Sequence, residues 1–170
     1  MSHGIITLEH QHGPEVRELT EARMEVLWMP SESEDRELDC EIVLSFEASN
    51  RPTKGQMSRA GFTPIDGEFR IKGDAFSADE FVGSKYSIAR GYDAAGEEYL
   101  TRLYHFEHLE ADEVEVEVLG FHDARYHIRI RAMCELDTYD GAGPRSEVVV
   151  DGWFAWSEEQ TDDDTGPASA

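Results

Sequence analysis

The sequence predicts an all-β protein, an antiparallel β-sandwich or β-barrel of about eight strands with few short helices. Three observations support this prediction. Apolar and polar residues alternate along most of the chain, segments rich in Gly, Pro, Asn and Asp separate these runs, and two neighbouring runs carry matching charge patterns at 113–136. A period of two is typical of strands with one buried face, so consecutive runs are expected to pair as hairpins.

Residues 1–21 are predicted to form an amino-terminal arm or a short helix, with Pro14 at the first helical position. From Ala22 onward, Ala22, Met24, Val26 and Trp28 alternate with polar residues, which indicates a half-buried strand. After an acidic connector at 31–39, residues 38–47 form one of the clearest predicted strands. The segment 48–68 lacks periodicity and is expected to be a long loop, a length that is often functional or mobile.

A short strand is predicted through Phe69 and Ile71, and one helical turn at 77–81. Residues 97–109 fit either a helix or a strand. The segment Asp93-Ala94-Ala95-Gly96 is a good hairpin loop, and aromatic residues are dense on both sides of it. We therefore favour a hairpin over a helix here.

The stretch EVEVEVLGFHDARYHIRIRAMCEL, 113–136, alternates glutamate with valine and then arginine with isoleucine. An antiparallel pairing with Glu117 opposite Arg129 and Val118 opposite Ile128 satisfies both patterns, with FHDAR (121–125) as the loop. A shorter loop, DAR (123–125), also keeps all charges on one face. The glutamates and arginines are expected to pair with each other across this hairpin and to fix its register.

The last predicted strand is 146–156. The segment 157–170 contains no Leu, Ile or Val, no aromatic residue and no basic residue. We therefore expect it to be a disordered acidic tail. Residues 22–156 are then expected to form a single β-rich domain.

The chain carries 37 Asp and Glu against 15 Lys and Arg, a net charge of −22. This excess of acid argues against nucleic acid and anionic membranes as partners and favours a basic protein. An inherited acidic composition is an alternative explanation, because charge also keeps proteins soluble. The amino terminus lacks the features of a signal peptide, so we expect a cytoplasmic location.

No catalytic signature is present, and no cofactor is expected. Weak candidates for a metal site are His10, His12, His105 and Glu107, which could share strand faces in a β-barrel. Cys40 and Cys134 lie within alternating runs, which indicates small buried hydrophobic residues rather than a disulfide.

Aromatic and acidic residues supply the other candidates. Trp28, Tyr86, Tyr104 and Phe106 could line a cavity for an apolar ligand if the strands close into a barrel. Trp153 and Trp156 have opposite strand parity, so at least one is expected near the surface, where Trp favours contacts. Together with the acidic connector, they give a candidate partner surface: Glu32, Glu34, Asp35, Glu37, Trp153 and Trp156.

These observations favour a non-catalytic protein-interaction module with an acidic surface. A concrete version is an inhibitor or immunity-type protein that binds a basic partner, whose encounter would be accelerated by electrostatic attraction. A β-barrel that binds a small apolar ligand and a metal-dependent β-barrel enzyme are the alternatives. Homo-oligomers joined through unpaired strand edges also fit the sequence.

Overall fold

The computed structural model describes residues 3–10, 13–31, 34–35, 38–55, 64–73, 75–105, 107–136 and 145–159. None of these residues lies in a helix, so the structure is all-β within the described part of the chain. The strands are β1 (Gly4–His10), β2 (Gly13–Pro30), β3 (Leu38–Ala48), β4 (Ile65–Gly73), β5 (Lys85–Ile88), β6 (Tyr92–Asp93), β7 (Glu98–Tyr99), β8 (Thr101–His105), β9 (Glu107–Leu109), β10 (Ala111–His122), β11 (Arg125–Cys134) and β12 (Ser146–Glu159).

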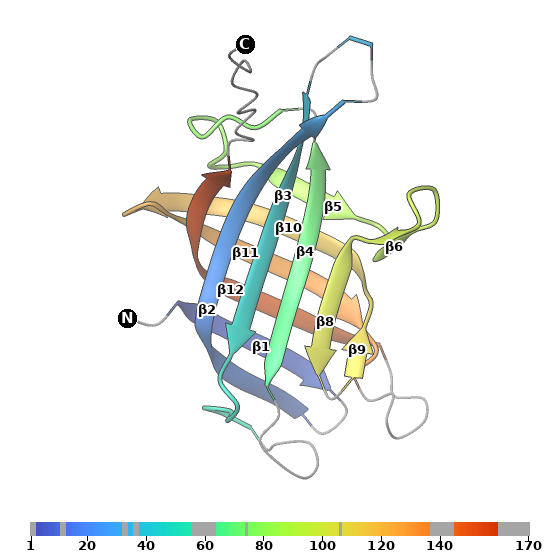
Figure 1. Ribbon diagram of the computed structural model, residues 1–170. Helices are drawn as coiled ribbons and strands as arrows, with labels where there is room; N and C mark the ends of the chain where they lie inside the picture. Colours follow the sequence, from blue (N-terminus) through green and yellow to red (C-terminus); the bar gives the residue numbers. More distant parts are fainter. Residues whose placement is uncertain are drawn as a thin grey trace, which may run out of the picture.

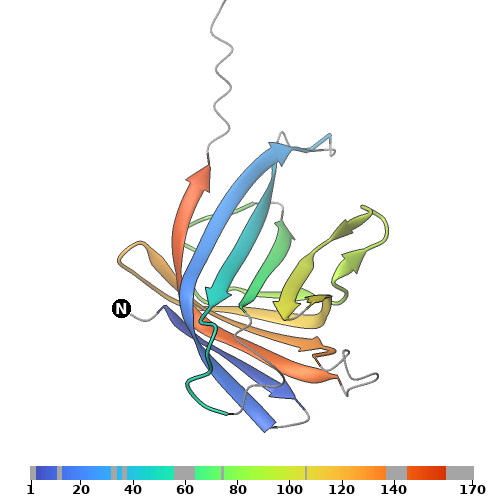
Figure 2. The ribbon, with the colours of Figure 1, turned by 60° about the horizontal axis from the view of Figure 1, so that its bottom comes forward.

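Ten of these strands form one open sheet in the order β5-β10-β11-β12-β1-β2-β3-β4-β8-β9. All neighbours in this order pair antiparallel, and the end of β12 also pairs parallel with β2. The sheet folds over on itself: β2, β3, β4 and β8 lie in front of β10, β11, β12 and β1 and cross them steeply (Figures 1 and 2). The prediction of an antiparallel all-β fold is confirmed, but the sheet has more strands than the eight expected.

The first 21 residues correct the sequence prediction. Among the described residues of this segment, Gly4–His10 form β1 and 13–21 form the first part of β2, so the short helix beginning at Pro14 is wrong. A register shift between Leu19 and Glu21 interrupts the alternation of buried and exposed residues along β2. As a result, both Leu19 and Ala22 are buried, although they are three residues apart. The bulge reverses the parity of the strand, and an alternation read from one end fails at this point.

The inward face of early β2 is also unusual in chemistry. Glu15 and Arg17 are 0% and 1% exposed, and Arg17 Nε donates a hydrogen bond to Glu15 Oε1 at 2.5 Å. Arg17 also donates to the carbonyl oxygen of Ser49 at 3.1 Å. Two charged residues at core positions remove the hydrophobic signal that would have identified this part of the strand.

The hairpin of β10 and β11 has the predicted central register. Glu117 faces Arg129, Val118 faces Ile128, and Val116 faces Ile130. A register shift between Val118 and Gly120 then shortens the expected loop to Asp123 and Ala124, whose φ angles of 49° and 56° suit a type I′ turn. The valines and isoleucines of both strands enter the core.

The described residues of 97–109 form short strands rather than a helix, as predicted. β6 pairs with β7 through Tyr92–Tyr99 and Asp93–Glu98, which confirms the hairpin, and β8 and β9 follow. The expected helical turn at 77–81 is a hydrogen-bonded turn in which Glu80 N donates to Ser77 O at 3.1 Å. The β6–β7 hairpin projects from the body of the fold (Figure 1).

The core lies between the two layers of the folded sheet. Its large, fully buried residues include Ile6, Leu8, Met24, Leu44, Phe69, Ile128 and Phe154. Cys40 and Cys134 are buried and do not form a disulfide, in agreement with the sequence prediction. In the described part of the chain, no helix has the length and apolarity needed to cross a bilayer.

Candidate functional site

Six aromatic rings gather at one end of the fold, and we call this cluster the aromatic end. Its members come from the β4–β5 connection and from four strands. Tyr126 is its centre, 4.9 Å from Phe81, 4.6 Å from Phe121 and 5.8 Å from Trp156 between ring centroids. The complete set is Phe76, Phe81, Tyr86, Phe121, Tyr126 and Trp156.

Strand register brings the rings of β10, β11 and β12 together. Phe121 faces Tyr126 across the β10–β11 hairpin, close to its two-residue turn. Trp156 lies beyond the last paired residue of β12 on β11, and its backbone N–H donates to the carbonyl of Ala124 in this turn at 3.1 Å. The tight turn therefore carries Phe121 and Trp156 to the same side of Tyr126, with 6.3 Å between their ring centroids.

The connection between β4 and β5 covers the other side of Tyr126. The hydroxyl of Tyr126 donates a hydrogen bond to the carbonyl of Ala78 at 3.3 Å, and Gly83 N donates to Val118 O at 2.8 Å. Phe81 packs edge-on against Tyr126 and is only 2% exposed. These contacts hold the inner rings rigidly, because edge-to-face aromatic packing is directional.

The outer rings of the aromatic end are not covered by the fold. Phe121 is 49% exposed, and the neighbouring Leu119 and Val82 are 41% and 45% exposed. The indole nitrogen of Trp156 is buried, yet it has no hydrogen-bond acceptor among the described residues. A buried donor left without an acceptor costs about 1–3 kcal/mol, but this nitrogen is covered, so the accessible feature of this end is its exposed apolar area.

Acidic side chains surround these apolar residues. Asp79 and Glu80 are exposed in the connection next to Phe76 and Phe81, and Asp123 is exposed in the turn next to Phe121. An apolar centre with a charged rim is the usual anatomy of a protein interface.

A second acidic feature lies on the outer face of the front layer. Glu47 on β3 has Glu21 of β2 and Asp66 of β4 as its direct neighbours across the sheet. These residues line a groove of about 330 Å³, and its other charged or aromatic lining residues include Arg23, Glu68, Arg102, Tyr104 and His108. Burial raises the pKa of Asp66, and this effect is opposed by the charge of His108. We call the three neighbouring carboxylates the acidic row.

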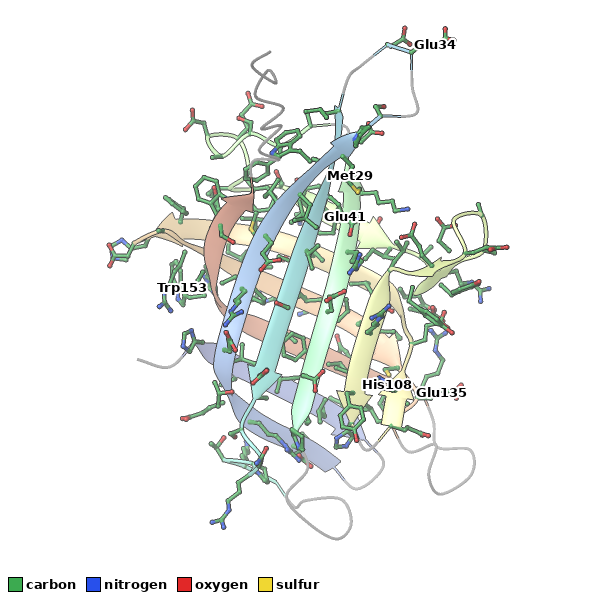
Figure 3. The ribbon with its side chains drawn as sticks, in the orientation of Figure 1. Met29, Glu34, Glu41, His108, Glu135 and Trp153 are labelled. Atoms are coloured by element: carbon green, nitrogen blue, oxygen red, sulfur yellow. The ribbon has the colours of Figure 1, made fainter. Side chains whose placement is uncertain are left out.

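The structure separates the predicted partner-binding residues. Trp156 belongs to the aromatic end, whereas Trp153 lies on the outer face of β12 and stacks on His127 at 4.9 Å between ring centroids. Glu34 and Asp35 are exposed in the β2–β3 connection, and Figure 3 shows Glu34 far from Trp153. Glu32 and Glu37 lie outside the described residues.

Two of the predicted metal ligands, His105 and Glu107, are register partners across β8 and β9, but they differ in burial. His105 is buried on β8, but Glu107 is exposed on β9. The side chain of His10 and all of His12 lie outside the described residues. Within the described ranges, no group of three His, Cys, Asp or Glu side chains could hold a metal ion.

The predicted ligand-lining aromatics lie in different surroundings. Trp28 packs against the core, Tyr86 contacts Phe81 in the aromatic end, and Tyr104 faces His108 on the outer surface. Phe106 lies outside the described residues. Sequence reasoning therefore named two members of the aromatic end, Trp156 and Tyr86, but assigned them to different sites.

Comparisons with models of protein families, with curated proteins and with solved structures found no match to this chain.

Proposed function

We propose that this protein is a non-catalytic interaction module that binds a basic protein partner through the aromatic end. The observation that carries the proposal is the exposed apolar surface at this end, where Phe121 is 49% exposed beside Trp156, and Leu119 and Val82 are 41% and 45% exposed. A partner that covers Phe121 with an apolar side chain would bury this surface. Trp and other large aromatics are frequent centres of binding energy in interfaces.

The charge of the chain supports the basic nature of the partner. Exposed Asp79, Glu80 and Asp123 surround the apolar centre, and the whole chain carries a net charge of −22. Such a field speeds the encounter with a basic protein, and the rate falls as salt screens it. An inhibitor or immunity-type protein that covers a basic enzyme is a concrete form of this function.

The proposal can be tested by site-specific photocrosslinking in lysate from the source cells. A photoreactive phenylalanine analogue replaces Phe121 in one sample and Tyr99 in the other, because both side chains are 49% exposed. Tyr99 lies on the β6–β7 hairpin and serves as the matched control. We expect a basic protein to be crosslinked through position 121 and not through position 99.

The captured protein is then purified and titrated with wild type and with Phe121→Ala. We expect the substitution to weaken binding at least about tenfold, the loss typical of a central aromatic contact. We also expect the association rate to fall with rising salt. Equal crosslinking at both positions, or a captured partner that binds Phe121→Ala as tightly as wild type, would refute the proposal.

A further inference from the structure

A cleft opens where the two ends of the ten-stranded sheet approach each other. Hydrogen bonds join the two ends along part of this boundary. Leu100 N donates to Gly91 O at 2.7 Å, and the Thr101 hydroxyl donates to Ala111 O at 2.8 Å. A Cβ atom on Gly91 would lie 2.2 Å from Thr101 Oγ1, so the backbones here are in close contact.

Beyond this closed part, β4 and β5 separate and leave a cleft of about 540 Å³. The two inward-facing isoleucines of these strands, Ile71 and Ile88, form its apolar floor and are 5% and 6% exposed. Leu100 and Tyr92 add apolar surface on the side of the β6–β7 hairpin. The volume suits one or two apolar side chains of an incoming ligand.

One wall of the cleft is an unpaired strand edge. β5 is a terminal strand of the sheet and pairs only with β10 in the described part of the chain. Val118 N donates to Ser84 O at 3.0 Å, and hydrogen-bonded positions alternate along an antiparallel pair. The backbone N–H and C=O of Ser87 therefore point away from β10, toward the side where another strand could add.

The charge of the cleft differs from that of the rest of the protein. Its charged lining residues are Arg70, Lys72 and Arg90 against a single acid, Asp93. Arg70 is bound by Glu41 and Glu68, and Lys72 by Glu98. Arg90 is exposed and forms no ion pair with any residue that the structure describes. Arg90 also borders a neighbouring groove lined by Glu107, Glu110, Asp112 and Glu135, so a ligand carboxylate at the rim would compete with these acids for it.

We propose that the β5 edge and this cleft form a docking site for an extended peptide segment of alternating acidic and apolar residues. The segment adds to β5 as a further strand through main-chain hydrogen bonds, and it places an apolar side chain over Ile71 and Ile88. Its acidic residues face Arg90. This site is distinct from the aromatic end and has the opposite charge preference.

The probe for the test is a short capped peptide of alternating glutamate and valine, titrated by calorimetry against the full chain. Three comparison ligands separate the sources of affinity. Alternate N-methylation of the peptide removes the donors for strand pairing, a lysine–valine peptide reverses the charge, and decanoate offers only an anionic apolar ligand. We expect binding of the glutamate–valine peptide, with weaker or no binding of the other three.

Two substitutions of Ser87 form a matched pair for the backbone contact. Ser87→Pro removes an N–H that faces away from β10, a position where an edge strand tolerates proline, and Ser87→Ala keeps the N–H. We expect Ser87→Pro to raise the Kd for the glutamate–valine peptide at least about tenfold and Ser87→Ala to change it less than about twofold. Unchanged thermal unfolding of both variants shows that the fold is intact.

Arg90→Glu tests the charge preference and is expected to weaken the glutamate–valine peptide while strengthening the lysine–valine peptide. Phe121→Ala should leave peptide binding unchanged, which separates this site from the proposed function. The inference fails if the peptide does not bind at about 1 mM, a limit that corresponds to a free energy near −4 kcal/mol. It also fails if decanoate binds and competes with the peptide, or if Ser87→Pro binds as well as Ser87→Ala.

Discussion

Arg129 of β11 binds Asp151 of β12, with 2.8 Å between Arg129 Nη2 and Asp151 Oδ2. Its backbone partner across the β10–β11 hairpin is Glu117, and this glutamate instead binds Lys85 of β5 at 2.6 Å. The opposing charges of the hairpin thus face each other along the backbone, but their described ion pairs extend outward to the neighbouring strands. The charges connect four strands of the back layer rather than two.

Asp151 is the acceptor for two cations, and this gives a prediction on acid stability. Burial opposes ionisation of Asp151, but hydrogen bonds from His127 and Arg129 outweigh burial and lower its pKa below the ordinary value of 3.8. A lowered pKa in the folded state contributes stability above the ordinary pKa, and this contribution is lost as pH falls through the folded pKa. We expect Asp151→Asn to cost about 1 kcal/mol near neutral pH, because the pair is partly exposed.

The cost should shrink from about pH 5 to pH 3 and disappear in stronger acid, as measured by urea unfolding at each pH. Asp79→Asn is the matched control, since this side chain is exposed in the β4–β5 connection. A constant difference between Asp151→Asn and wild type across this pH range would contradict the assignment.

The turn between β10 and β11 gives a second prediction. Ala124 has a φ of 56°, a conformation that is unfavourable for a residue with a Cβ atom and is easily adopted by glycine. We expect Ala124→Gly to raise the unfolding free energy by about 0.5–1 kcal/mol. Ala94→Gly in the β6–β7 turn is the control, because Ala94 is also exposed and is not among the residues with positive φ. A loss of stability in both variants would show that the turn is not under this strain.

This turn also shows how far the sequence determined the fold. Alternation of Glu with Val and of Arg with Ile was sufficient to place Glu117 opposite Arg129, because burial and charge specify the same register. The bulge after Val118 was not predictable, because one extra residue leaves no compositional mark. The same limitation hid the start of β2, where the bulge near Thr20 and the buried charges of Glu15 and Arg17 interrupt the pattern.

The candidate site was less accessible to sequence reasoning. The sequence predicts Trp156 as a partner-binding residue only from the face of the strand on which it lies. It places Phe121 in the hairpin loop, and Phe76 and Phe81 in a connection between strands. Their convergence on Tyr126 depends on the shortened turn and on the path of residues 75–84, neither of which periodicity determines. Extending the predicted register past Val118 does not pair Phe121 with Tyr126, because the register shift between Val118 and Gly120 lies in between.

The acidic row gives the third prediction. Glu47 lies directly between Glu21 and Asp66, and like charges on facing strand positions are destabilising by about 0.2–1 kcal/mol per pair. We therefore expect Glu47→Gln to raise the midpoint of urea unfolding. Glu18→Gln changes the net charge equally but removes a carboxylate that faces Ile5, so it should have a smaller effect. The gain should decline at about 1 M salt, and a gain that is independent of salt would argue against charge repulsion.

The fourth prediction concerns the buried pair of Glu15 and Arg17. Arg17→Met retains the length of the side chain but leaves the Glu15 carboxylate in the core without its cation. Removing one member of a buried ion pair typically costs about 3–5 kcal/mol, because the remaining charge is poorly solvated. Arg23→Met is the control, since the Arg23 side chain is 61% exposed in its ion pair with Glu21 and should cost less than about 1 kcal/mol.

The double substitution Glu15→Gln and Arg17→Met separates charge from packing. If the remaining carboxylate causes the loss, neutralising it should recover a large part of the stability, and the sum of the single effects should exceed the effect of the double variant. Urea unfolding of all four proteins provides the measurement. Equal costs for Arg17→Met and Arg23→Met would show that the buried pair contributes no more than a surface contact, and the stability of early β2 would then rest on apolar packing that includes Ile6, Leu8 and Leu19.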